Sequence, residues 1–276
     1  MQKLNIFSYF KQRIKCVVFT AVLAVFVAFC LCTGIYFAAT GHAASCVKSF
    51  LFILIVPALY IIEYLLGVKL TPSICALLLI IPVGSILGAG FNLYTVIPYL
   101  DTIMHTLSGF VFACFGFSVM KIFIGEPKSN RAFFAYLLFG VAFSLLIAVL
   151  WELYEFTCDA LFGGDLQEDT VIKGFYSFKI SGDHGAAFDA SGIDKTVIYF
   201  ADGREAFEFD GYLDIGLIDT IIDMAVCFLG SLIYFVLFAL DWFKFNKTLN
   251  KVFIPGLTTQ TVGQTAEEEQ LSLFDK

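Results

Sequence analysis

The sequence predicts an all-α polytopic membrane protein with six transmembrane helices and a small extracytoplasmic cap that contains a β-hairpin. Of its 276 residues, 59% are hydrophobic and 15% are charged, whereas soluble domains are about 45–50% apolar and about 25% charged. Six apolar stretches each reach the roughly 20 residues that a helix needs to cross a bilayer. The expected partner is therefore the lipid bilayer. The net charge of −7, without a basic patch, gives no support to nucleic-acid binding.

The first three spans are expected at 16–40, 47–66 and 72–91. The run at 16–40 is longer than the roughly 7–15 apolar residues of a signal peptide, so an uncleaved anchor is predicted. The turn at 67–71 is short enough to join the second and third spans into a helical hairpin. Glu63, near the end of the second span, is expected to reach toward the interface or to pair with Lys69.

The remaining spans are expected at 99–124, 132–159 and 215–240. The predicted organisation is therefore five transmembrane helices in 1–159, a cap in 160–214, a sixth helix in 215–243, and a cytoplasmic, partly disordered tail in 244–276. Within the cap, 195–201 and 204–209 flank Asp202-Gly203. Asp-Gly is typical of a two-residue type I′ turn, so a hairpin is predicted there, with 170–180 as a third strand.

The distribution of basic residues predicts the orientation. In a six-span arrangement, 12 of the 17 Lys and Arg residues fall on the side of the two termini. The positive-inside rule then places both termini in the cytoplasm and the cap outside the cytoplasmic membrane.

Acidic side chains and one histidine gather at the predicted outer ends of the last three spans. They are spaced three or four residues apart, which places them on one face of each helix. Ionisable groups at membrane depth tend to face a shared interior site. The residues predicted to converge are Asp101, His105, Glu152, Glu155, Asp159, Asp219 and Asp223. His184 in the cap is expected to reach the same place.

Six neighbouring carboxylates cannot all stay ionised in a low dielectric, so either bound cations or protons must compensate them. Carboxylates with one imidazole suit Mg, Mn, Fe or Zn, and such pairs build di-metal centres inside helical bundles. Two simpler interpretations remain open. A protonated network could only fix helix packing, and residues near span ends, Asp159 above all, could cap helices or face water. Trp151 is expected to be an interfacial aromatic residue.

These motifs resemble a known family. Asp101 to His105 with Ser108-Gly109-Phe110, Trp151-Glu152-x-x-Glu155 with Gln167, and Asp219-Thr220-x-x-Asp223 with Gly230 are similar to segments of YjdF-type inner-membrane proteins. A weaker similarity extends to VanZ-like membrane proteins. Thr102 stands where the family commonly has Lys. The resemblance implies a bacterial multi-pass membrane protein and supplies no reaction.

Three functional hypotheses follow. The first is a metal-dependent protein whose outward-facing centre acts on an envelope or lipid-linked substrate, and the sequence does not decide whether this action is enzymatic. The second is an ion-coupled transporter, which would need carboxylates through the membrane depth, whereas only Glu63 lies near the inner side. The third is a non-catalytic scaffold or resistance factor whose cap binds a partner.

Overall fold

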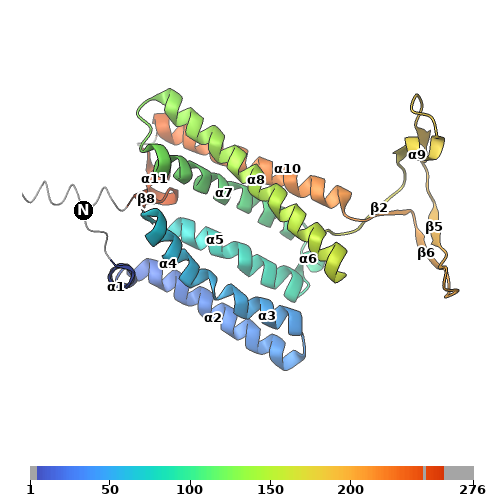
Figure 1. The fold of residues 1–276 in the computed structure, drawn as a ribbon, viewed down its shortest axis with the longest axis horizontal. Coiled ribbons are helices and arrows are strands. Elements are labelled where there is room, and N and C mark those ends of the chain that lie inside the picture. The colour runs from blue at the N-terminus through green and yellow to red at the C-terminus, as the bar shows by residue number, and fades with distance from the viewer. Residues whose placement is uncertain (1–4, 245–246, 258–276) are drawn as a thin grey trace, which may run out of the picture. The chain divides into compact units, whose positions relative to one another are not determined.

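The computed structural model describes residues 5–244 and 247–257, and within them six helical segments are long and apolar enough to cross a membrane (Figure 1). This confirms the predicted all-α polytopic class. The segments are formed by α2 (Val17–Thr40), α3 with α4 (Ala43–Phe52 and Ile55–Leu66), α5 with a π-helical turn (Pro72–Ser85 and Ile86–Gly90), α7 (Leu100–Ile124), α8 (Asn130–Phe162) and α10 (Leu217–Lys244). Short helices are α1 (Ile6–Ile14), α6 (Leu93–Val96), α9 (Phe178–Ser181) and α11 (Thr248–Phe253).

The chain divides into two compact units, Met1–Ile147 with Val226–Lys276, and Ala148–Ala225. Both boundaries fall inside long helices, α8 and α10. The first unit holds most of the apolar helices. The second holds the acidic end of α8, the intervening strands and the first two turns of α10.

In the first unit, α2 packs against α3 and α5, and α5 packs against α7. Phenylalanine fills much of its core, with Phe19, Phe37 and Phe117 among the fully buried side chains. Glycine brings α7 and α10 close together: a Cβ added at Gly230 would lie 1.9 Å from the Thr106 carbonyl oxygen. Small residues at such crossings let helix backbones approach within van der Waals contact.

One end of the first unit collects three segments that are far apart in sequence. There β1 (Val68–Lys69), in the turn between the second and third spans, pairs antiparallel with β8 (Gly256–Leu257). The buried Asp241 carboxylate accepts amide hydrogens of Thr248 and Leu249, each at 2.9 Å, which fixes the start of α11. The predicted tail is therefore folded as far as β8. The rest of the predicted tail, 258–276, lies outside the described residues.

The third segment at this end is α1, which is anchored through a buried ion pair. The Arg13 Nη2 lies 2.8 Å from Glu63 Oε1, with the two side chains 8% and 0% exposed. Arg13 also donates to the Leu70 carbonyl, and the Tyr9 hydroxyl donates to Glu63 Oε2 at 3.0 Å. The expectation that Glu63 reaches the interface or pairs with Lys69 was wrong, because Arg13, fifty positions earlier, supplies the cation inside the protein.

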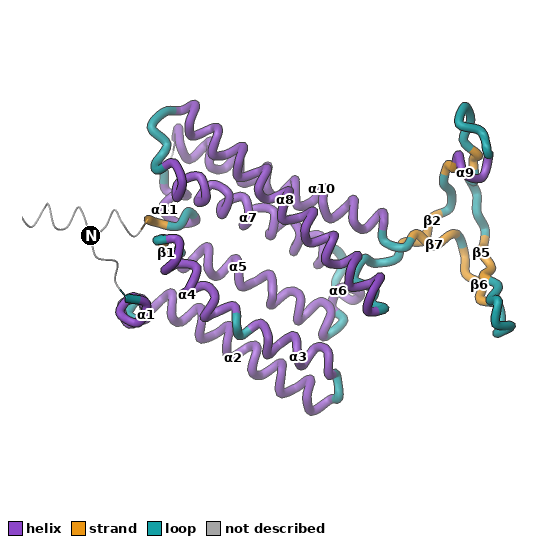
Figure 2. Tube along the Cα trace, in the orientation of Figure 1, coloured by secondary structure: helices purple, strands orange, loops and turns teal. Residues whose placement is uncertain are grey.

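The strands of the second unit form short two-stranded pairs, drawn orange in Figure 2. β5 (Lys195–Ile198) pairs with β6 (Phe207–Asp210), which confirms a hairpin at the predicted place. The two-residue turn was wrong, because residues 199–206 separate the strands. Side chains hold this wider loop: Arg204 pairs with Asp202 at 3.0 Å and lies over the Phe200 ring.

The predicted third strand, 170–180, is divided between two other pairs. β2 (Thr170–Ile172) pairs with β7 (Tyr212–Asp214), and β3 (Tyr176–Ser177) pairs with β4 (Phe188–Asp189). The pairing of β2 with β7 ties the segment that follows α8 to the segment that precedes α10. Neither strand adds to the β5–β6 hairpin among the described residues.

Candidate functional site

Three buried carboxylates form a compact cluster in the second unit. Glu152 and Glu155 come from the end of α8, and Asp223 comes from the second turn of α10. Each offers an oxygen atom within 4.8 Å of the others, and their side chains are 6%, 8% and 3% exposed. We call Glu152, Glu155 and Asp223 the carboxylate cluster. These are three of the seven residues predicted from the sequence.

The local sequence of α8 explains why two glutamates turn inward. A spacing of three residues places Glu152 and Glu155 on one face of a helix. The residues between and beside them, Leu153, Tyr154 and Phe156, are exposed, as apolar side chains are on the lipid-facing side of a span. Burial of the carboxylates is therefore a consequence of helical periodicity on a segment whose other face is apolar.

Trp151 is hydrogen-bonded to the cluster. Its indole Nε1–H donates to Glu155 Oε1 at 2.8 Å. A hydrogen bond of this length fixes the orientation of the carboxylate that accepts it. The sequence predicted Trp151 only as an interfacial aromatic residue. The missed signal was its spacing of four residues from Glu155, which places the two side chains on the same side of the helix.

The cluster concentrates negative charge where water is scarce. Three carboxylates within a few ångströms repel one another strongly, and the repulsion is poorly screened in a buried position. The chemical solutions are a bound cation or a shared proton. Carboxylate oxygens are ligands for hard or borderline divalent cations, so the donor set fits such an ion.

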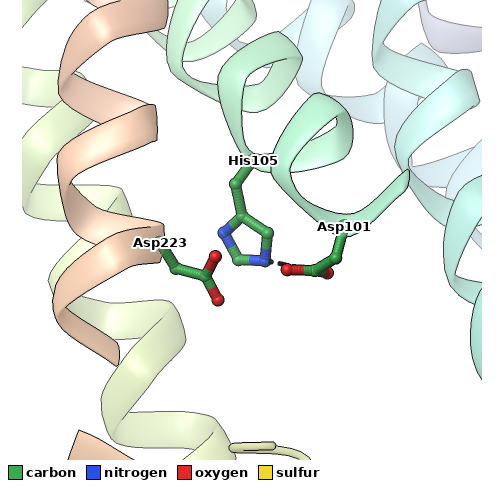
Figure 3. Close-up of side chains that lie close together, drawn as sticks. All are labelled: Asp101, His105 and Asp223. Carbon is green, nitrogen blue, oxygen red and sulfur yellow. Dashed lines mark ion pairs between the residues drawn. The ribbon is translucent and has the colours of Figure 1, made fainter. Parts of the chain in front are cut away.

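Asp101 and His105 form a pair on α7, in the first unit. His105 Nε2 lies 3.5 Å from Asp101 Oδ1, as the dashed line in Figure 3 marks. On the other side of the ring, Cys227 Sγ lies 4.0 Å from His105 Nδ1, and its thiol donates to the His105 carbonyl at 3.2 Å. Asp223 precedes Cys227 by one turn on the continuous helix α10.

Asp159 and Asp219 bind backbone amides of the loop that follows α8. The two oxygens of Asp159 accept from Leu166 N–H at 2.8 Å and Gln167 N–H at 2.9 Å. Asp219 Oδ2 accepts from Glu168 N–H at 2.9 Å. Both carboxylates thus hold this loop in place. Because Leu166 and Gln167 belong to a loop and not to the first turn of a helix, these contacts of Asp159 are not helix capping.

Two other residues picked out by the sequence lie near this loop or in the strand region. The Gln167 side-chain amide donates to the Thr220 hydroxyl, which links the loop to the first turn of α10. His184 lies against the Phe178 ring, with 6.2 Å between the ring centroids. The carboxylate cluster, as found among the described residues, does not include His184.

Six apolar spans and a cluster of buried carboxylates define this chain as a polytopic membrane protein with a polar centre. The family described as "Predicted membrane protein (DUF2238)" matches residues 18–242, and the chain belongs to this family. It is the family of the YjdF-type proteins that the sequence motifs resemble. No curated protein and no solved structure matches the chain. The weaker similarity to VanZ-like proteins stays a prediction.

Proposed function

We propose that this protein is a metal-dependent membrane protein whose carboxylate cluster binds a divalent cation and acts on an envelope or lipid-linked substrate. The observation that carries the proposal is the burial of Glu152, Glu155 and Asp223 with ligand oxygens within 4.8 Å of one another. Such a concentration of negative charge is costly in a folded protein without a compensating cation or proton.

The expected cation is Mg, Mn, Fe or Zn. Carboxylate ligands suit all four, and an imidazole would favour the last two. The sequence also assigned Asp101 and His105 to this centre, and their part in it stays a prediction. A bound divalent cation would polarise a phosphoryl or carbonyl oxygen, or lower the pKa of a bound water.

The chain's own residues have distinct proposed roles. Glu152, Glu155 and Asp223 hold the cation, and Trp151 keeps one Glu155 oxygen oriented through its indole N–H. Asp159 and Asp219 position the loop that joins α8 to β2 by accepting its backbone amides. The positive-inside rule supports an outward-facing centre, because the basic residues concentrate on the side of the termini.

Metal content tests the proposal directly. The full-length protein is purified from membranes in mild detergent, without chelator, and its metals are measured by elemental analysis. We expect close to one divalent ion per chain in the wild type, and at least a five-fold loss in Glu155→Gln and Asp223→Asn. The proposal is refuted if the purified wild-type protein contains no metal and if added metal does not raise its thermal unfolding temperature.

The matched controls are Asp159→Asn and Asp219→Asn. They also remove carboxylates of the second unit, but these two accept hydrogen bonds from backbone amides of the loop after α8. We expect both variants to keep the ion. Loss of metal in these variants, with thermal stability intact, would instead extend the centre to all seven predicted residues.

The transporter alternative is weakened by the partner of Glu63. A carboxylate that relays protons must be able to change its charge, whereas the two oxygens of Glu63 share the Arg13 Nε–H and one of them also accepts from Nη2. A bidentate pair of this kind holds both side chains in one geometry, so Glu63 is engaged in anchoring α1.

The scaffold alternative has one favourable observation. Large aromatic side chains of the strand region are exposed, with Tyr199 at 83% and Tyr176 at 73%. Exposed aromatic residues are common at protein–protein interfaces. If the purified protein folds without metal and only substitutions of these tyrosines impair its cellular role, the scaffold function is the better account.

A further inference from the structure

Helix α1 is amphipathic, but its polar side chains face the protein. The nine-residue helix buries Tyr9 and Arg13, and both contact the carboxylate of Glu63. In an ordinary surface helix the apolar residues face the core and the charged residues face water. In α1 the side that packs on the protein carries Tyr9 and Arg13 instead, so its apolar residues do not face the protein core.

The apolar residues of α1 form one exposed strip. Ile6, Phe7, Phe10 and Ile14 are all exposed, with Phe7 reaching 76%. Successive residues of an α-helix are rotated by about 100°, which places these four side chains within an arc of about 100°. The buried residues lie on one edge of this arc, and Lys11 lies on the other edge. We call Ile6, Phe7, Phe10 and Ile14 the apolar strip.

The position of α1 identifies what covers the apolar strip. Figures 1 and 2 show α1 end-on, whereas α2 and α5 run across the picture, so α1 lies crosswise to the spans of its own unit. Its last residue is Ile14, and the first span begins at Val17. A helix that lies crosswise, two residues from the start of a span, lies at the level of the membrane surface.

We propose that α1 is an interfacial helix that inserts its apolar strip between the lipids and places Lys11 and Lys15 beside anionic headgroups. Interfacial helices have this arrangement, with aromatic and aliphatic residues toward the acyl chains and lysines at their border. Both lysines are exposed. Basic residues close to a span end are attracted to anionic lipids.

The buried ion pair sets the direction in which the strip points. Arg13 and Tyr9 hold α1 to Glu63, and Arg13 also bonds the Leu70 carbonyl, so the helix cannot roll about its axis without breaking these contacts. The Asn5 side chain caps its first turn through the Ser8 amide at 2.8 Å. The lipid-facing strip is therefore preformed, and lipid binding requires no ordering of this helix.

Site-specific photocrosslinking in the full-length protein tests the proposal. Phe7 or, as a matched control on the remaining face of the helix, the exposed Gln12 is replaced by the photoreactive analogue benzoylphenylalanine. Each variant is reconstituted into vesicles of phosphatidylcholine and phosphatidylglycerol, irradiated and analysed by intact-protein mass spectrometry. We expect lipid adducts at position 7 and at least ten-fold fewer at position 12.

Equal adduct yields at the two positions would overturn the proposal. So would a covalent dimer formed from position 7, because the strip would then be an interface between copies. If the position 7 variant fails to fold, the same reporter at Ile14 replaces it. For the headgroup contact, Lys11→Gln combined with Lys15→Gln should reduce the share of phosphatidylglycerol among the adducts to its mole fraction in the vesicles. An unchanged share would remove the headgroup contact from the proposal.

Discussion

Removing Arg13 should destabilise the protein far more than its place at the N-terminal edge of the chain suggests. Arg13→Met leaves the Glu63 carboxylate, which is 0% exposed, without its cation. Loss of one partner of a buried ion pair typically costs about 3–5 kcal/mol. Two other donors, the Tyr9 hydroxyl and the Leu70 amide, remain on Glu63, so we expect a cost near about 3 kcal/mol.

The measurement is a double-mutant cycle of Arg13→Met, Glu63→Leu and the two together. The free energy of unfolding is followed in detergent with increasing SDS. Replacing both members of a buried pair with apolar residues of similar volume is often close to neutral. We therefore expect the double variant to be more stable than Arg13→Met. The exposed pair Lys195 and Glu208, 2.9 Å apart, is the control, and its removal should have little effect.

A loss of less than about 1 kcal/mol in Arg13→Met, which is the range of solvent-exposed pairs, would refute a stabilising buried pair. Simple addition of the effects of the two single substitutions would also refute it, because residues that act through one contact should couple.

Two further changes probe the helix crossing and the acidic loop. Gly230→Ala would bring a Cβ to 1.9 Å from the Thr106 carbonyl oxygen, so we expect a loss of about 1–3 kcal/mol by the same unfolding assay. Gly256→Ala, where nothing lies within 4 Å, should be much milder, and an equal loss would contradict the packing argument. Burial, with the nearby Asp165, Asp214 and Asp159, raises the pKa of Asp169. The ionised form is thus disfavoured in the folded loop, and stability should fall as the pH rises through this raised pKa. Asp169→Asn should slow amide hydrogen exchange of the loop at pH 7, with the difference shrinking below pH 3.8, the ordinary value for this carboxyl; an equal effect at both pH values would refute the assignment.

The spans were predictable because hydropathy is averaged over some twenty residues, and no tertiary contact needs to be known. The predicted fourth span, 99–124, differs by one residue from α7 (Leu100–Ile124). The burial of Glu152 and Glu155 follows from the same local reasoning, since an apolar helix turns its few polar residues away from lipid.

What the sequence could not supply were pairings between distant segments. Arg13 lies outside the spans, and nothing in its surroundings points to Glu63 as its partner. The seven acidic and histidine residues were alike as a pattern, yet Asp159 and Asp219 bind backbone amides of one loop. The path of the chain after α8 decides which carboxylates accept hydrogen bonds from the loop. Helical periodicity carries no information about that path.

The pairing of β1 with β8 has a consequence for how the chain is made. Val68 emerges from the ribosome nearly two hundred positions before its partner Leu257. The hairpin of the second and third spans must therefore wait in the bilayer, with β1 unpaired, until Leu257 has been made. Two more contacts hold the same end of the first unit together. The Thr71 hydroxyl donates to the Val252 carbonyl, and the buried Asp241 accepts from the Thr248 amide. A chain truncated just after α10 would keep all six apolar spans and yet lack the pairing of β1 with β8.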